Sequence, residues 1–319
     1  MRSICRKKEE LPSILTSEGG FKALSVVTSI PEWILRLWRD DYGASEAKSM
    51  AFAFSDLKPY ITLRVNTVKT TREKMLSALG AKASPCRYSD VGIRMDGSFP
   101  ATDLYGFDNG LFFVQDEASQ MVASMIRDVK PDTVVVDCCA CPGGKTFSAA
   151  MTVFGKGKVY SFDLHENRTT LIQKGAERLG LDNITAAARD ARNPDENLFG
   201  KADYVICDVP CSGLGVIGKK PDIRHKSKDE IENLPSVQYD ILCQSVKYLK
   251  PGGTLIYSTC TLRKAENEDI VNRFISEHGN EGYELCSTDL FGTDDGFVTF
   301  MPHKTNTDGF FGAKIVKKQ

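Results

Sequence analysis

The sequence has no apolar run near the length of about 18 residues that a membrane-spanning helix needs. Residues 1–12 are charged where a secretory signal peptide needs an apolar stretch. There is also no excess of one charge, because 41 Lys and Arg residues face 42 Asp and Glu residues. These absences argue against a membrane span, against secretion and against a chain-wide basic surface. We therefore expect a cytoplasmic protein in which any site for a polyanion is local.

Ten of the 319 residues are cysteine. In a short secreted chain, that number would predict a disulfide framework. Here the chain is long and carries no secretion signal, so we expect reduced thiols. Cysteine chemistry is therefore a candidate function.

The pattern of residues 1–110 predicts two parts, a helical extension and a small domain. Aromatic and apolar side chains recur at helical spacing in residues 31–50, and we interpret residues 1–45 as a helical extension. The alternating run 61–66 predicts a strand, followed by a helix that ends at Gly80. Together with shorter strand-like segments, this pattern predicts a small α+β domain at residues 46–110.

After residue 110, short β-rich runs alternate with helical stretches; the runs lie at 133–136, 158–162, 183–188, 202–207 and 253–258. Continuous apolar strands separated by helices predict a parallel sheet covered on both faces, the doubly wound α/β fold. No long helix separates the final two runs, 296–301 and 309–316, which predicts an antiparallel hairpin at one edge. Residues 111–319 are therefore predicted to form one α/β domain.

Polar residues end these predicted strands, where open α/β sheets bind their ligands. The four acids and two cysteines at these positions are Asp137, Asp163, Asp190, Asp208, Cys211 and Cys260. One acid at a strand end is about as often a cap for the next helix, but four on one rim favour a binding site. Lys145 lies among these acids, and we expect it to hold Asp208 or a ligand group in place.

Residues 143–146 match the end of the phosphate-binding P-loop pattern. The spacing excludes a P-loop, because its first glycine would fall at Cys139, and the dinucleotide fingerprint is absent too. What remains is a tight glycine turn where a ligand approaches the backbone, with Asp163 suited to a ribose diol. This predicts a nucleoside cofactor without a pyrophosphate, and it disfavours an NTPase.

The cysteines allow three interpretations. The spacings Cys138-x-x-Cys141 and Cys207-x-x-x-Cys211 resemble those of metal ligands, but the pairs are far apart and Cys207 lies in a predicted buried strand, so we expect no metal site. A Cys-x-x-Cys redox pair is a second interpretation, although such pairs open a helix and lack a row of acids. Cys211 and Cys260 each follow a strand beside a carboxylate, which suits nucleophilic catalysis.

A basic stretch at residues 217–228 follows Cys211. Its cations are Lys219, Lys220, Arg224, Lys226 and Lys228, against one acid, Asp222. Such a run is usually a solvated face. Because it is attached to the loop of a candidate nucleophile, it is also a credible contact for phosphates.

Three separated groups of residues resemble the RNA cytosine-C5 methyltransferases (Nol/Nop/Sun type). They are Asp137-x-Cys139-Ala140-x-Pro142-Gly143-Gly144-Lys145-Thr146, Asp208-x-Pro210-Cys211-Ser212-Gly213, and Ser258-Thr259-Cys260-Thr261 with Glu266-Asn267-Glu268. Within this family the chain is most similar to the bacterial Sun/Fmu type, which methylates small-subunit ribosomal RNA. The resemblance runs from about residue 30 to the end, with further matches at 63–67, 114–120 and 302–311.

The resemblance implies a Rossmann-like class I methyltransferase sheet with an antiparallel last strand, and S-adenosylmethionine as cofactor. The residues implied to wrap its methionine and sulfonium side are Cys139, Ala140, Cys141, Pro142, Gly143, Gly144 and Lys145. Asp163 would hold the ribose hydroxyls, Asp190 would meet the adenine edge, and Asp208 would lie between cofactor and target base. Cys260 is implied to be the nucleophile, and Cys211 is implied to assist product release.

The implied activity is methyl transfer to carbon 5 of a cytidine in 16S rRNA through a covalent adduct between Cys260 and carbon 6. We expect a monomer that acts before assembly of the small subunit is complete. Residues 46–110 would bind RNA. The alternative is a noncatalytic RNA-binding assembly factor with the same fold, which the presence of Cys260, Cys211, Asp208 and Lys145 disfavours.

The sequence departs from the family pattern in two places. Cys138 and Cys141 stand where small residues are more common, and Cys141 adds a larger side chain to the cofactor turn. The second departure is at the front, where residues 2–6 resemble the end of the last helix of an N-terminal NusB-like domain. We therefore expect residues 1–45 to be the remnant of that domain and its linker.

Overall fold

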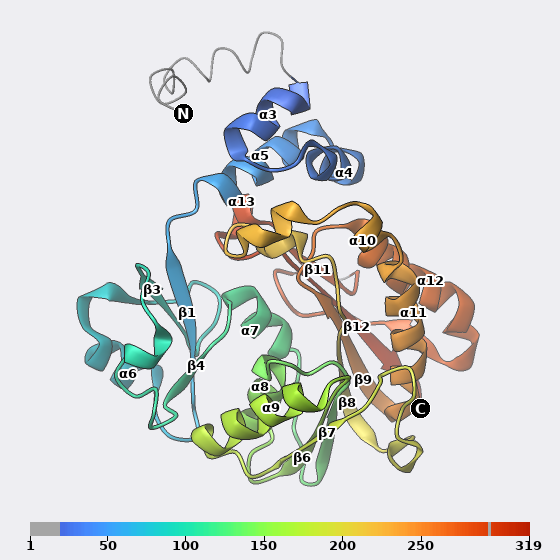
Figure 1. The fold of residues 1–319 in the computed structure, drawn as a ribbon. Helices are drawn as coiled ribbons and strands as arrows, with labels where there is room; N and C mark the ends of the chain where they lie inside the picture. The colour runs from blue at the N-terminus through green and yellow to red at the C-terminus, as the bar shows by residue number, and fades with distance from the viewer. Residues whose placement is uncertain (1–19, 293–294) are drawn as a thin grey trace.

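The computed structural model describes residues 20–292 and 295–319. It begins with three helices, α3 (Gly20–Thr28), α4 (Glu32–Tyr42) and α5 (Ala44–Ser55), which lie together at the top of Figure 1. Ile34 and Trp38, spaced one helical turn apart on α4, are fully buried, and their apolar cluster includes Leu214 and Leu262 from loops of the large sheet. The helices are thus packed onto that sheet's loops. Residues 2–6, expected to resemble a NusB-like helix, lie outside the described residues.

The small unit is a four-stranded antiparallel sheet in the order β2-β3-β1-β4. Its strands are β1 (Tyr60–Val65), β2 (Ala83–Pro85), β3 (Gly92–Asp96) and β4 (Phe112–Val114). Helix α6 (Arg72–Leu79) covers one face, and Met75 packs there against Leu63 and Val65. The predicted α+β unit is therefore present.

The large sheet has eight strands in the order β10-β12-β9-β8-β5-β6-β7, with β11 paired to β12. They are β5 (Thr133–Asp137), β6 (Gly157–Asp163), β7 (Ile184–Ala188), β8 (Ala202–Asp208), β9 (Leu249–Thr259), β10 (Tyr283–Leu285), β11 (Phe297–Phe300) and β12 (Phe310–Lys317). Strands β5 to β9 are parallel, and β12 runs antiparallel to β9. The predicted Rossmann-like sheet with an antiparallel last strand is confirmed.

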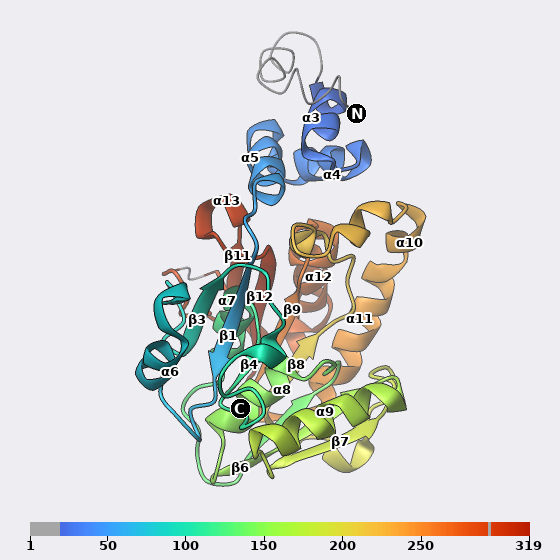
Figure 2. The ribbon, with the colours of Figure 1, turned by 60° about the vertical axis from the view of Figure 1, so that its left-hand side comes forward.

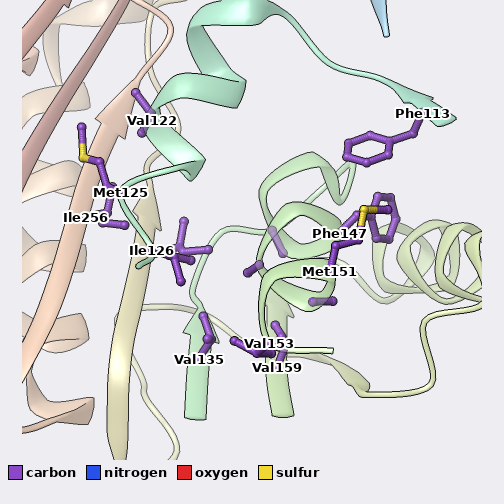
Figure 3. Close-up of a cluster of buried hydrophobic side chains, with 14 of the residues drawn as sticks. Phe113, Val122, Met125, Ile126, Val135, Phe147, Met151, Val153, Val159 and Ile256 are labelled. Atoms are coloured by element: carbon purple, nitrogen blue, oxygen red, sulfur yellow. The ribbon is translucent and has the colours of Figure 1, made fainter. Parts of the chain in front are cut away.

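Helices cover both faces of this sheet because its strands alternate between two apolar clusters. Val135 and Ile256 face α7 (Glu117–Ala123), α8 (Gly144–Thr152) and α9 (Glu166–Leu179), as Figure 3 shows in part. Val136 and Leu255 face α11 (Leu234–Ser245) and α12 (Glu268–His278). In Figure 2 the small sheet and α6 lie on the left and α11 on the right. The short helices α10 (Asp229–Glu232) and α13 (Pro302–Thr305) lie in connecting segments.

Strands β11 and β12 pair antiparallel, from Phe297↔Ala313 to Phe300↔Phe310, so the predicted hairpin is confirmed. Strand β10 was not predicted; it pairs with the far end of β12, so β12 has neighbours on both sides. Two elements cross the predicted domain boundaries. Helix α5 spans the boundary at residue 45, and β4 lies past residue 110 but pairs with β1. The division into 1–45, 46–110 and 111–319 stays a prediction.

Candidate active site

Two thiols meet where the neighbouring parallel strands β8 and β9 end. The Sγ atoms of Cys211 and Cys260 lie 3.3 Å apart, and both side chains are partly buried. With Cys211 as the donor, this hydrogen bond lowers the pKa of Cys260. The same contact, together with burial, raises the pKa of Cys211. Because the thiolate is the reactive form, Cys260 is the better nucleophile of the pair.

A fully buried carboxylate holds the two thiol loops. Oε2 of Glu266 accepts hydrogen bonds from the backbone N–H of Ser212 (2.8 Å) and from Nε2 of Gln238 (2.9 Å). Gln238 also donates to the carbonyl of Pro210 at 2.9 Å. A buried carboxylate is costly without such partners. Glu266 therefore ties the loop after β8 to the segment after β9.

Asp208 is held from two sides at the end of β8. Its Oδ2 lies 2.8 Å from Nζ of Lys145, and its Oδ1 accepts a hydrogen bond from Ser258 at 2.7 Å. The Lys145 side chain is only 6% exposed, whereas that of Asp208 is 33% exposed. The Asp208 carboxylate is therefore held in place and is still partly exposed at the edge where the parallel strands end. The sequence predicted that Lys145 holds Asp208 or a ligand group, and the structure brings Lys145 and Asp208 together.

A tight glycine turn joins β5 to α8. Gly143 has φ 107°, and a Cβ added there would lie 2.5 Å from Cζ of Phe147, so the turn requires glycine. The N–H of Gly143 donates to the carbonyl of Ala140 at 2.7 Å. Oδ2 of the buried Asp137 accepts from Thr146 at 2.6 Å, while its Oδ1 has no hydrogen-bond partner among the described residues. Burial raises the pKa of Asp137 to about 7.

Asp163 and Asp190 lie beyond this turn. The two carboxylate oxygens of Asp163, which is nearly buried, accept from the N–H groups of Cys141 and His165, each at 3.2 Å. Asp190 lies past the end of β7 and pairs with Arg192 at 2.7 Å, which lowers the pKa of Asp190. Since β8, β5, β6 and β7 are neighbours in that order, all four predicted acids lie along one edge of the sheet.

The other cysteines near this edge differ from Cys260. Burial raises the pKa of Cys138 to about 12, raises the pKa of Cys139 and Cys207 well above the usual value, and also raises that of Cys141. These groups are therefore thiols at neutral pH. Within the described part of the chain, no group of three or more His, Cys, Asp or Glu side chains is arranged to hold a metal ion.

The basic stretch after Cys211 is only partly available for phosphates. Lys219 pairs with Asp116 and Asp308, Arg224 donates to backbone carbonyls of the N-terminal helices, and Lys226 donates to the carbonyl of Ser212. The exposed Lys220 and Lys228 form no ion pair with any residue that the structure describes. Lys219, Arg224 and Lys226 are therefore engaged within the protein, and contact between this stretch and phosphates stays a prediction.

Sequence reasoning gave no role to three residues of this site, Ser258, Gln238 and Glu266. Ser258 lies two residues before Cys260 in the same motif, and this position could have marked it as a site residue. In the structure it pairs in register with Asp208. Gln238 lies on α11, 28 residues from Pro210, and no local pattern marks it. Such contacts between distant segments depend on how the helices pack.

The edge suits S-adenosylmethionine. Gly143 has no side chain in the tight turn, and the carboxylate of Asp163 lies beside that turn, held by the N–H groups of Cys141 and His165. Its nearest cation is Arg168, 3.8 Å from Oδ1. No helix in residues 20–292 or 295–319 is long and apolar enough to cross a membrane.

Comparisons with known proteins agree with this geometry. A family model described as 16S rRNA methyltransferase RsmB/F matches residues 124–316, and the RsmF/B-like ferredoxin-like domain matches residues 30–102. The probable ribosomal RNA small subunit methyltransferase B of Bacillus subtilis is 36% identical, over 100% of this chain and 72% of that protein. The protein of the same name from Synechocystis is 33% identical, over 99% and 73%.

A solved structure described as a methyltransferase homolog protein from Pyrococcus horikoshii superposes with a TM-score of 0.78 at 26% identity, covering 94% of this chain and 99% of that chain. The fold is thus that of a methyltransferase whose methyl donor is S-adenosylmethionine. With the family model covering more than half of its length, this chain belongs to the RsmB/F family of 16S rRNA methyltransferases.

Proposed function

We propose that this protein transfers a methyl group from S-adenosylmethionine to carbon 5 of a cytidine in 16S rRNA. The observation that carries the proposal is the thiol pair, in which Cys211 lies 3.3 Å from Cys260 and lowers its pKa. A thiolate next to a fixed carboxylate suits addition to a pyrimidine ring. The names of the relatives support small-subunit rRNA as the substrate. We further propose that the protein acts in the cytoplasm as a monomer, before subunit assembly is complete.

The cofactor would lie along the edge formed by β5, β6 and β7. Asp163 would accept from the ribose hydroxyls and Asp190 would meet the adenine edge. The turn at residues 139–145 would hold the methionine side, because Gly143 allows the tight bend that its φ of 107° requires. When bound, S-adenosylmethionine supplies an electrophilic methyl group on its sulfonium sulfur.

Carbon 5 of cytosine is a poor nucleophile, so the ring must first be activated. The Cys260 thiolate would add to carbon 6, while the electron pair of the C5–C6 double bond moves through carbon 4 toward N3, which takes up a proton from solvent water. The N3–H and N4–H groups of the base would then donate hydrogen bonds to the Asp208 carboxylate, which holds the protonated ring in place. Lys145 keeps Asp208 in place through their 2.8 Å ion pair. The target base must leave its stack to reach these groups.

Methyl transfer leaves carbon 5 with both a proton and the new methyl group. A base would remove that proton, the C5–C6 double bond would form again, the sulfur of Cys260 would leave as a thiolate, and N3 would return its proton to solvent. Cys211 would assist this release by donating to the departing thiolate the hydrogen bond that it makes in the free protein.

The test is transfer of labelled methyl from S-adenosylmethionine to protein-free small-subunit rRNA, followed by nucleoside analysis. We expect 5-methylcytidine with the wild type, none with Cys260→Ala, and a denaturation-resistant protein–RNA adduct with Cys211→Ala. Cys286→Ala is the control, because this exposed cysteine lies next to β10, away from the thiol pair. Full transfer by Cys260→Ala, or a different methylated position, would contradict the proposal. Cofactor binding without transfer would favour a noncatalytic RNA-binding factor.

A further inference from the structure

A charged cluster beside the thiol loops has no role in the chemistry above. Nζ of Lys219 lies 2.7 Å from Oδ2 of Asp116, 3.1 Å from Oδ2 of Asp308 and 4.3 Å from the ring centroid of Tyr60. Lys219 belongs to the loop that carries Cys211. Its partners come from strand β1, from the residue that caps α7 and from the turn before β12. The cluster therefore joins the small sheet, the thiol loop and the C-terminal strand.

The cluster is too enclosed to be a surface ion pair. The side chains of Lys219, Asp116 and Asp308 are 25%, 12% and 9% exposed. Burial and the nearby Asp116 raise the pKa of Asp308 to about 7, and the two carboxylates raise that of Lys219 although burial alone would lower it. Moving Lys219 away would leave two carboxylates buried without a cation. Its position is therefore strongly determined.

A short hydrogen-bonded path leads from this cluster to the nucleophile. Gly309, which follows Asp308, donates its N–H to the carbonyl of Gly215 at 2.7 Å. Gly215 in turn donates its N–H to the carbonyl of Cys260 at 3.0 Å. The contact between the glycines is close, because a Cβ on Gly215 would lie 2.0 Å from the carbonyl oxygen of Gly309. A shift of the turn at Asp308 would therefore displace the backbone of Cys260.

We propose that Lys219 and Asp308 are positioning residues that hold the loop of Cys211 against the turn before β12, so that Cys211 and Cys260 stay in hydrogen-bond contact. Neither residue touches the reacting atoms. The inference rests on the proposed use of Cys260 as the nucleophile. It is tested through thiol reactivity, which requires neither RNA nor cofactor.

The measurement is the rate of alkylation of Cys260 by iodoacetamide as a function of pH, with peptide mass spectrometry to identify the labelled cysteine. In Lys219→Met we expect the midpoint of the rate profile to rise by about one pH unit, and the rate at neutral pH to fall about tenfold. Both changes follow from loss of the hydrogen bond that Cys211 donates. The groups whose interactions set the pKa of Cys260 stay unaltered in this variant: Cys211, Asp208, Lys145 and Lys220.

A second variant keeps the test informative if Lys219→Met alone fails to fold. Lys219→Met alone leaves two buried carboxylates, whereas Lys219→Met with Asp308→Asn removes one charge of each sign and keeps the net charge of the cluster. We expect the double variant to remain folded by circular dichroism and to show the same shifted profile. Lys228→Met is the matched control, since this exposed lysine of the same stretch should leave the profile unchanged.

The proposal is wrong if the folded double variant alkylates with the wild-type rate and midpoint. It is also wrong if Lys228→Met shifts the profile as much as Lys219→Met, because the effect would then come from the charge of the loop. A wild type that methylates no RNA, while Lys219→Met still shifts its alkylation profile, would contradict the proposed function and leave the positioning role standing.

Discussion

Nζ of Lys145 lies 2.8 Å from Oδ2 of Asp208, and this ion pair joins the glycine turn to the end of strand β8. The ammonium group is buried on the first turn of α8, and the carboxylate opens to the rim beside Cys260. The pair thus connects the edge that suits the cofactor with the thiols that suit the target base. Its charges also act on Cys260, because Lys145 lowers the pKa of that thiol and Asp208 raises it.

Lys145→Met should lower kcat for methyl transfer about 100-fold, because Asp208 loses the cation that fixes it. The pKa of Cys260 should also rise, since the lowering effect of Lys145 is lost. Single-turnover methylation and alkylation of Cys260 measure the two effects. Lys314→Met is the control, because Lys314 pairs with Asp289 on a different part of the sheet. A kcat within twofold of wild type would show that Asp208 needs no such partner.

Ser258→Ala should have a smaller effect, because Asp208 keeps its ion pair and loses one neutral donor at 2.7 Å. We expect kcat to fall about tenfold, the equivalent of about 1.4 kcal/mol, with the protein still folded. Steady-state kinetics measures the loss of kcat, and urea unfolding measures any loss of folding stability. A large loss of stability with unchanged kcat would assign Ser258 to folding alone.

The pH dependence of cysteine reactivity should report the thiol pair. Because Cys211 lowers the pKa of Cys260, alkylation of wild-type Cys260 should rise with pH at lower values than for an ordinary thiol. Cys211→Ala removes the donor, so the rise should move to higher pH. Stopped-flow alkylation between pH 6 and about 10 provides the measurement. An unchanged profile in Cys211→Ala would mean that the 3.3 Å contact does not set the reactivity of Cys260.

Asp137→Asn should remove part of the pH dependence of folding stability. The folded pKa of Asp137 is about 7, above its ordinary value of 3.8, so the native state binds more protons than the unfolded state between these values. Stability should therefore fall as pH rises from about 5 to 7, by about 2 kcal/mol from this group. Urea unfolding at both pH values should show a smaller fall in the variant. Asp308, with a similar pKa, should account for a remaining fall of the same sign.

Gly143→Ala should weaken S-adenosylmethionine binding at least tenfold, because the new methyl group would meet the ring of Phe147 and displace the turn. Gly155→Ala is the matched control: Gly155 also has a positive φ, of 70°, but a Cβ there would meet nothing within 4 Å. Both variants should lose stability through backbone strain, about 1 kcal/mol. Calorimetric titration with the cofactor should separate them, and equal affinities would show that the turn does not hold the ligand.

Much of the fold was predictable because local patterns carry it. The runs that became β5 to β9 are continuous and apolar, and each is bounded by turn residues, so their order predicted the parallel sheet. Strand β10 was missed because it has only three residues, which are too few to show the alternation of a strand. It pairs only with the end of β12. Strand β4, which lies past residue 110, was also not predicted, because its pairing with β1 joins segments far apart in the chain.

Chain order and strand period can be read from the residues alone, and they place Asp137, Asp208 and Cys260 at one edge of the sheet. How those side chains interact depends on the packing of the whole chain. It set the 3.3 Å separation of Cys211 and Cys260, and it placed Lys219 between two buried carboxylates instead of on a solvated face. The reason is physical: strand order follows from local patterns, but contacts between loops depend on the packing of segments that are distant in the chain.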